Sequence, residues 1–155
     1  MIIMKTEVAV KGISGKSIYD FMLNSTDKDY QEWWEGTHLA FHTIQRFPND
    51  LGNLVYVDEY VGSRSLKFEG VVIKLIPGKE IVWQMKKVVR MPAWIVLEFK
   101  DNKGGVVVAH TLKVGLAGIG RLMDPFIKLY LNKGFENDLE EHAHIEFTKL
   151  EEILT

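Results

Sequence analysis

The sequence has no cysteine among its 155 residues and no large excess of either charge. Without cysteine there is no disulfide framework and no thiolate chemistry, so any metal site has to use His, Asp and Glu side chains. The formal net charge of −2 gives no basic footprint for nucleic acid or for an anionic membrane. No stretch approaches the ~20 apolar residues that span a bilayer. The apolar start Met1–Met4 becomes charged at Lys5, too soon for a signal peptide. We therefore expect a cytoplasmic protein that neither inserts into membranes nor binds nucleic acid.

The composition indicates one globular domain over residues 1–155, because apolar residues make up 46% of the chain and charged residues 26%. Residues 2–11 alternate loosely with period two and predict a strand, and two short helices are expected over 16–24 and 28–35. From residue 39 the period is again two, and turn residues such as Pro77-Gly78 separate the segments. Six further strands are expected, over residues 39–46, 54–61, 65–76, 80–88, 93–101 and 105–115.

A long helical pattern begins near Gly120 and runs almost to Thr155, with Gly134 expected to mark a bend. With more than 30 residues, this helix is the only element large enough to cover the apolar face of a curved antiparallel sheet. We therefore predict an α+β fold, in the order β-α-α-β-β-β-β-β-β-α, whose sheet wraps around the C-terminal helix. The gap between sheet and helix is a natural pocket for a small hydrophobic or aromatic molecule. The sequence leaves open whether an edge strand pairs with a second copy in a homodimer.

Within that helix, His142 and Glu146 are four residues apart and share one face. At this spacing two side chains can hold one metal ion. The same pattern is also typical of a solvated helix face, so a metal site needs further ligands elsewhere in the chain. His144 is two residues from His142, points to another side of the helix and is expected at the surface.

Two strand positions are candidates to face the pocket. His110 alternates with Val108 and Leu112, so we expect it on the inner face, either as a hydrogen-bonded core histidine or as a functional residue. Glu69 shares its strand face with apolar neighbours, and an inward carboxylate needs a cation or a hydrogen-bond donor beside it. Glu59 has apolar neighbours of the same kind, and strand parity alone does not separate the two carboxylates.

The segment around the start of the second strand carries aromatic residues and two more histidines. His38 is expected at the pocket mouth, and His42 on the same strand face but deeper. At least one of Trp33 and Trp34 is expected to pack under the short helices. One histidine of the mouth, one Glu of the sheet and the helical pair together make four nitrogen and oxygen ligands. Zinc suits that set, with iron or manganese as alternatives. The candidate ligand-binding residues are Trp34, Phe41 and His42.

The order of elements resembles the helix-grip fold of the START and Bet v 1-like (SRPBCC) superfamily over essentially the whole chain. The stretches Lys79–Gln84 and Phe147–Leu154 look like those of its polyketide cyclase-like members. The candidate site residues resemble a smaller family, phloretin hydrolase and 2,4-diacetylphloroglucinol hydrolase, which are zinc-dependent C–C bond hydrolases with a Bet v 1-like domain. In that family a His near the second strand, a Glu from the sheet and a His-x-x-x-Glu pair on the last helix hold the metal.

This resemblance implies a set of metal ligands and favours Glu69 over Glu59, because the interval from His38 to Glu69 is similar to the family pattern. It also implies Tyr30 and His110 as catalytic residues. The chain departs from the family in two respects: those enzymes are longer, and Phe41 stands where the family has an Asn. The implied metal ligands are His38, Glu69, His142 and Glu146.

The expected function is hydrolysis of a C–C or ester bond in an acyl-aromatic or polyketide-like substrate, at a zinc ion in a hydrophobic pocket. Two alternatives remain open at the level of sequence. One is a non-catalytic protein that binds or transports a hydrophobic ligand or lipid. The other is a metal-free cyclase or dehydrase that uses His110 and a tyrosine as acid and base.

Overall fold

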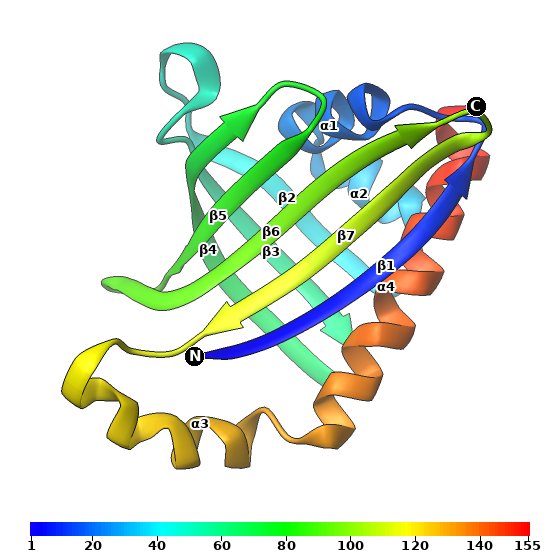
Figure 1. Cartoon of the computed structure of the whole chain (residues 1–155). Helices are drawn as coiled ribbons and strands as arrows, with labels where there is room; N and C mark the ends of the chain where they lie inside the picture. Colours follow the sequence, from blue (N-terminus) through cyan, green and yellow to red (C-terminus); the bar gives the residue numbers. More distant parts are fainter.

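The computed structural model describes residues 1–155, and its centre is one curved sheet of seven antiparallel strands (Figure 1). The strand order is β1-β7-β6-β5-β4-β3-β2, so β1 alone pairs with a strand distant in sequence. The seven predicted strands and their antiparallel pairing are confirmed. Their bounds are β1 (Ile2–Lys11), β2 (His38–Gln45), β3 (Leu54–Val61), β4 (Arg64–Ile76), β5 (Glu80–Lys86), β6 (Arg90–Asn102) and β7 (Gly105–Val114).

The two predicted short helices are also confirmed, and each begins at a side-chain cap. Ser14 accepts a hydrogen bond from the backbone N–H of Ser17 at the start of α1 (Gly15–Asn24). Thr26 and Asp29 form a reciprocal capping box at the start of α2 (Asp27–Trp33). One short 3-10 helix, η1 (Pro48–Asp50), lies between β2 and β3. The caps fix the points at which the chain enters the two helices that close one end of the sheet.

The prediction of a single C-terminal helix longer than 30 residues is wrong. After β7 the chain forms a 3-10 helix, η2 (Gly118–Met123), a short helix, α3 (Asp124–Tyr130), and only then α4 (Lys133–Leu154). Helical geometry ends at Leu131, with φ −93° and ψ 64°, and Asn132 caps α4 by accepting a hydrogen bond from the Phe135 N–H at 3.0 Å. Gly134 therefore lies in the first turn of α4. None of the helices combines the length and apolar character needed to cross a bilayer.

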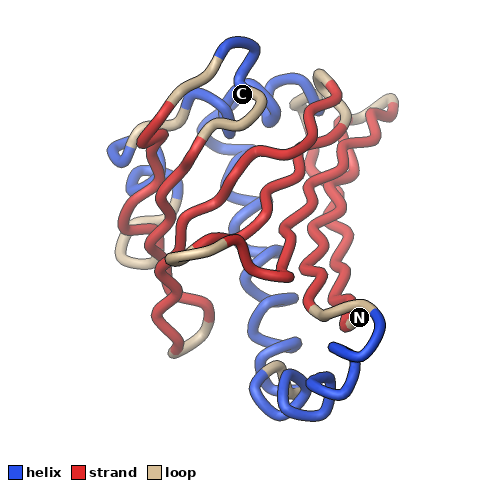
Figure 2. The backbone as a smooth tube through the Cα atoms, turned by 90° about the vertical axis from the view of Figure 1, so that its left-hand side faces the viewer, coloured by secondary structure: helices blue, strands red, loops and turns tan.

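Helix α4 lies against the inner side of the curved sheet, in contact with β1 on one side and with β3 and α2 on the other (Figures 1 and 2). Toward its C-terminus, Phe147 and Leu150 are fully buried in the main core together with Val106 and Val108 of β7. Burial of such apolar side chains contributes about 1.5–3 kcal/mol each, which fixes the helix on the sheet. Its buried residues recur at helical spacing and include two ionisable ones: Phe135, Leu139, His142, Ala143, Glu146, Phe147 and Leu150.

Candidate metal centre and ligand pocket

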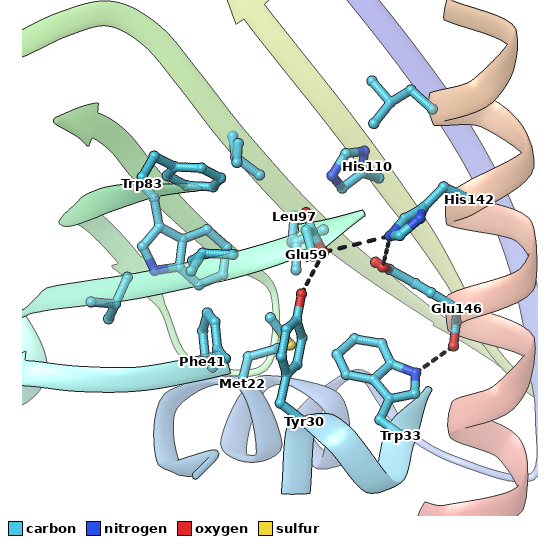
Figure 3. A pocket seen from close by; sticks show the side chains of 15 residues that line it. Met22, Tyr30, Trp33, Phe41, Glu59, Trp83, Leu97, His110, His142 and Glu146 are labelled. Carbon is cyan, nitrogen blue, oxygen red and sulfur yellow. Dashed lines mark hydrogen bonds and ion pairs between the residues drawn. The ribbon is translucent and has the colours of Figure 1, made fainter. Parts of the chain in front are cut away.

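Four ionisable side chains from three elements converge inside the sheet. They are His38 of β2, Glu59 of β3, and His142 and Glu146 of α4, and one nitrogen or oxygen atom from each lies within 4.8 Å of the other three. Figure 3 shows Glu59, His142 and Glu146 pointing toward one another across the hollow between β3 and α4. His38 is completely buried, and His142 and Glu146 are also buried. The grouping contains the donor types that zinc binds in proteins.

The distances between these atoms match those between ligands of one tetrahedral metal ion. His142 Nε2 lies 2.9 Å from Glu146 Oε2 and 3.5 Å from Glu59 Oε2. His38 Nε2 lies 3.4 Å from Glu146 Oε2 and 3.8 Å from Glu59 Oε2. Four donors about 2.0–2.1 Å from a central zinc would be separated by roughly 3.3–3.4 Å. The four observed distances lie on both sides of that value.

The imidazole nitrogens are close to the carboxylate oxygens but form no hydrogen bond with them. Neither His38 Nε2 nor His142 Nε2 meets the geometry of a hydrogen bond, although both are buried. Buried polar atoms in folded proteins nearly always have a partner, so an unsatisfied pair in one place needs an explanation. A metal ion between the four side chains would give both nitrogens a partner.

The electrostatics of the site favour a cation at its centre. Burial lowers the pKa of His142, but the carboxylates of Glu146 and Glu59 close to its Nε2 outweigh this effect and raise it to about 10. Burial likewise raises the pKa of Glu146, but His142 and His38 outweigh it and hold that pKa below its usual range. Two buried carboxylates are costly without compensating positive charge. A divalent ion between two carboxylates and two neutral imidazoles would bring the net charge of the site to zero.

Aromatic residues of α2 hold the two halves of the site in position. The Tyr30 hydroxyl donates a hydrogen bond to Glu59 Oε2, and its ring stacks on His38 with centroids 3.9 Å apart and planes 5° apart. Trp33 meets His38 edge-on at 4.7 Å, and its indole N–H donates to the Glu146 backbone carbonyl at 2.6 Å. Because His38 Nδ1 has no hydrogen-bond partner, ring packing orients this imidazole. Burial and the Glu59 charge raise the pKa of Tyr30 well above its usual value, so the phenol keeps its proton.

The expectation that Glu69 is the sheet carboxylate of this group is wrong, because Glu69 is on the other face of the sheet. In β4, Phe68 faces the pocket, so the adjacent Glu69 points outward, where its carboxylate lies 2.9 Å from Lys86 Nζ. Glu59 follows Val55 and Val57, which are buried on the inner face of β3. Glu69 also has apolar neighbours in the sequence, so strand parity left both carboxylates possible, and the interval from His38 favoured the wrong one.

His42 also lies elsewhere than expected, because β2 is irregular. The pairing of β2 with β3 shifts register between His38 and Ala40, so His38 and Phe41 both face inward. His42 is consequently turned to the outside, where its Nδ1 lies 2.7 Å from Asp27 Oδ1. The prediction that His42 shares the inner face with His38 is therefore wrong, whereas Phe41 lines the inner pocket as expected.

Trp34 does not line the ligand pocket. Its ring packs on His142 at 4.8 Å between centroids, and it borders a shallow polar hollow at the surface with Tyr60 and Asp138. Trp34 therefore covers the metal-ligand group from the solvent side. His144 is exposed, as predicted.

Two neighbouring hollows lie between the four-residue group and the surface, and they share part of their lining. The inner one, of about 70 Å³, is bordered by Tyr30, Glu59, His142 and Glu146 together with apolar side chains. The outer one, of about 510 Å³, lies between β4–β7 and the segment α3–α4, and 14 of its 19 lining residues are hydrophobic. Both hollows are bordered by Glu59, Phe68, Ile95, His110 and Leu139.

His110 lies at the junction of the two hollows, on the inner face of β7 as predicted (Figure 3). Its Nδ1 is buried without a hydrogen-bond partner. Burial lowers the pKa of His110, although Glu146 and Glu59 act in the opposite direction. The lowered pKa favours the neutral imidazole at pH 7.

No family model matches the chain, and no curated relative matches it. Solved structures match it over almost its whole length. The Aha1 dimer from Colwellia psychrerythraea is 18% identical, with a TM-score of 0.54, and the match covers 94% of this chain and 98% of that one. Ara h 8.0201 is 8% identical with a TM-score of 0.61, covering 99% and 97% of the two chains. A START superfamily protein from Mycobacterium smegmatis is 14% identical with a TM-score of 0.53, covering 91% and 94%. The chain has the START/Bet v 1-like fold.

In this START/Bet v 1-like fold, the outer pocket is also lined by residues that belong to no motif in the sequence. Phe126, Ile127 and Tyr130 reach it from α3, a helix that was assigned to one continuous C-terminal helix. Met85 and Met91 reach it from the ends of β5 and β6. In the sequence, the α3 residues belong to the apolar pattern that begins near Gly120. That pattern was fully explained by one long helix, so it gave no separate indication of a pocket wall.

Proposed function

We propose that this protein is a zinc-dependent hydrolase that removes an acyl group from an aromatic or polyketide-like substrate. The observation that carries the proposal is the convergence of His38, Glu59, His142 and Glu146 at the inner end of an apolar pocket. Two imidazoles and two carboxylates form a donor set of intermediate hardness, which zinc suits best, while iron and manganese accept the same ligands. Bound zinc would polarise a substrate carbonyl and lower the pKa of a water molecule.

The residues around the four ligands are assigned to orienting a ligand, transferring a proton and binding the substrate. Tyr30 is fully protonated and donates to Glu59, so we assign it to orienting that carboxylate. His110 is neutral, has a free nitrogen and lies where the inner and outer hollows meet, so we assign it to proton transfer. The apolar walls bind the body of the substrate and exclude bulk water from the reacting carbonyl.

The proposed reaction consumes one water molecule. The oxygen of water forms a bond to the acyl carbon, and the bond from that carbon to the aromatic ring breaks. The ring carbon takes up a proton through His110, so the products are an arene and a carboxylic acid. An ester follows the same course, with an alcohol or phenol as the leaving group.

The decisive experiment measures metal and turnover on protein purified without a histidine tag. Mass spectrometry of the dialysed protein should find one zinc per chain, and an acyl-substituted polyphenol should yield the arene and the acid. His110→Ala should retain the metal but lose turnover, whereas His142→Ala should lose both. Protein that binds none of zinc, iron and manganese on reconstitution would overturn the proposal, and so would full turnover by His142→Ala without metal.

A second function, the binding or transport of a hydrophobic ligand without chemistry, is favoured by one observation. The outer pocket, of about 510 Å³, is lined mostly by apolar residues and is large enough for a lipid chain or a multi-ring molecule. A ligand that co-purifies with metal-free protein, together with no turnover after zinc is supplied, would support this function over hydrolysis.

A further inference from the structure

Two segments beside the opening of the outer pocket expose large apolar side chains to solvent. One is the β5–β6 hairpin tip, with Val88 and Val89, and the other is the η2–α3 arm, with Ile119, Leu122 and Leu129. Each of these five side chains is between 70% and 92% exposed. We call these five residues the mouth rim. Scattered apolar residues are normal on a protein surface, but a cluster of this kind marks a site of interaction.

The two segments that carry the mouth rim border the same opening. Lys87 and Met91 of the hairpin line the outer pocket from one side, and Phe126 and Tyr130 of α3 line it from the other. In Figure 1 both segments project on the left-hand side of the molecule, with the η2–α3 arm below the hairpin tip. Whatever contacts the mouth rim therefore also covers the entrance to the pocket.

The same two segments carry unbalanced positive charge. Lys87 and Arg90 flank the hairpin valines, and Arg121 and Lys128 are on the η2–α3 arm. All four are exposed, and none of them forms an ion pair with a carboxylate of the chain. The acids nearby are already paired: Asp124 lies 3.3 Å from the N-terminal ammonium and Glu69 lies 2.9 Å from Lys86. This end of the molecule is thus positive, although the chain as a whole carries −2.

We propose that the mouth rim docks on the anionic face of a lipid bilayer, so that the pocket opens toward the membrane. Protruding apolar side chains flanked by Lys and Arg enter the headgroup region, while the cations contact anionic lipids. A second copy of the chain fits this surface less well, since a symmetric contact between mouth rims would bring the four unpaired cations of one copy against the same four of the other. Docking of this kind is peripheral and needs no spanning helix. This docking does not depend on whether a metal ion is bound in the inner site.

The first test measures how the purified protein co-sediments with vesicles. Binding is expected to vesicles that contain phosphatidylserine and to be much weaker with phosphatidylcholine alone. Lys87→Gln with Arg121→Gln should weaken binding about fivefold for each charge removed, and added salt should weaken the binding of the wild type. Val89→Ser with Leu122→Ser should also weaken it. Leu51→Ser is the matched control, because Leu51 is an exposed apolar residue at the opposite end of the strands.

A second test uses the absence of cysteine, which allows one label to be placed at a chosen site. An environment-sensitive fluorophore on Val89→Cys or Leu122→Cys should shift to the blue when anionic vesicles are added, and the same label on Leu51→Cys should not. Equal signals at all three sites, or equal sedimentation of wild type and rim variants, would overturn the proposal. So would a dimer in solution that the Val89→Ser and Leu122→Ser changes abolish.

Discussion

Replacement of Glu59 by glutamine is the sharpest test of the candidate metal centre. Glutamine keeps the size of the side chain and one oxygen, so packing against Tyr30 and His38 is preserved while one of the two carboxylate charges is lost. A unit charge about 4 Å from another contributes about 4 kcal/mol at the effective dielectric constant of a partly buried site. The ion is divalent and the ligand is closer, so this figure is a conservative one. We therefore expect Glu59→Gln to weaken zinc binding at least about a thousandfold.

The matched control is Glu69→Gln, which makes the same chemical change on the other face of the sheet. Glu69 is 31% exposed and forms an ion pair with Lys86, an interaction that contributes no more than about 1 kcal/mol to stability. Zinc affinity, measured by competition with a chromophoric chelator, should be unchanged in this variant. The site assignment is refuted if Glu59→Gln binds zinc as tightly as the wild type, or if Glu69→Gln loses it to the same extent.

Further predictions concern metal, positioning and stability. Zinc at about a hundred times its dissociation constant should stabilise the protein by about 2.7 kcal/mol, which raises Tm by roughly 5–10 °C in calorimetry; an unchanged Tm would contradict the site. Tyr30→Phe removes the hydroxyl from Glu59 and should weaken zinc binding about 10- to 100-fold, as the same chelator competition will measure. Phe147→Ala should cost about 3–5 kcal/mol in urea unfolding, because the ring is fully buried. Hydrogen bonds from the Thr26 backbone and side chain lower the pKa of Asp29 below 3.8, so this stabilisation is present above that pH and is lost as the pH falls through the lowered value. Asp29→Asn should remove that pH dependence from denaturation midpoints.

The sheet could be predicted from the sequence because its signals are local. Period-two alternation identifies each strand, and turns such as Pro77-Gly78 separate one from the next, so consecutive antiparallel pairing follows. The pairing of β1 with β7 is long-range, and no local signal in the sequence indicates it.

The break before α4 could not be predicted in the same way. The apolar spacing that begins near Gly120 continues into α4 without a change of period, so the pattern indicates one helix. The helical backbone of α3 ends at Leu131, and the Asn132 side chain then accepts a hydrogen bond from the Phe135 N–H at the start of α4. The sequence alone does not distinguish an Asn inside a helix from an Asn that caps a new helix. Which of the two forms depends on whether tertiary packing stabilises the continuous helix.

The site shows the same division between local and long-range information. His142 and Glu146 could be paired from the sequence because four residues along a helix always bring two side chains to one face. Glu59 and His42 could not be placed, since the first depends on which face of β3 meets the helix and the second on a register shift after His38. A shift of one residue moves a strand side chain to the opposite face. A metal site inferred from residue spacing alone is therefore least reliable for its ligands on strands. The comparison of Glu59→Gln with Glu69→Gln tests the strand ligand of this site.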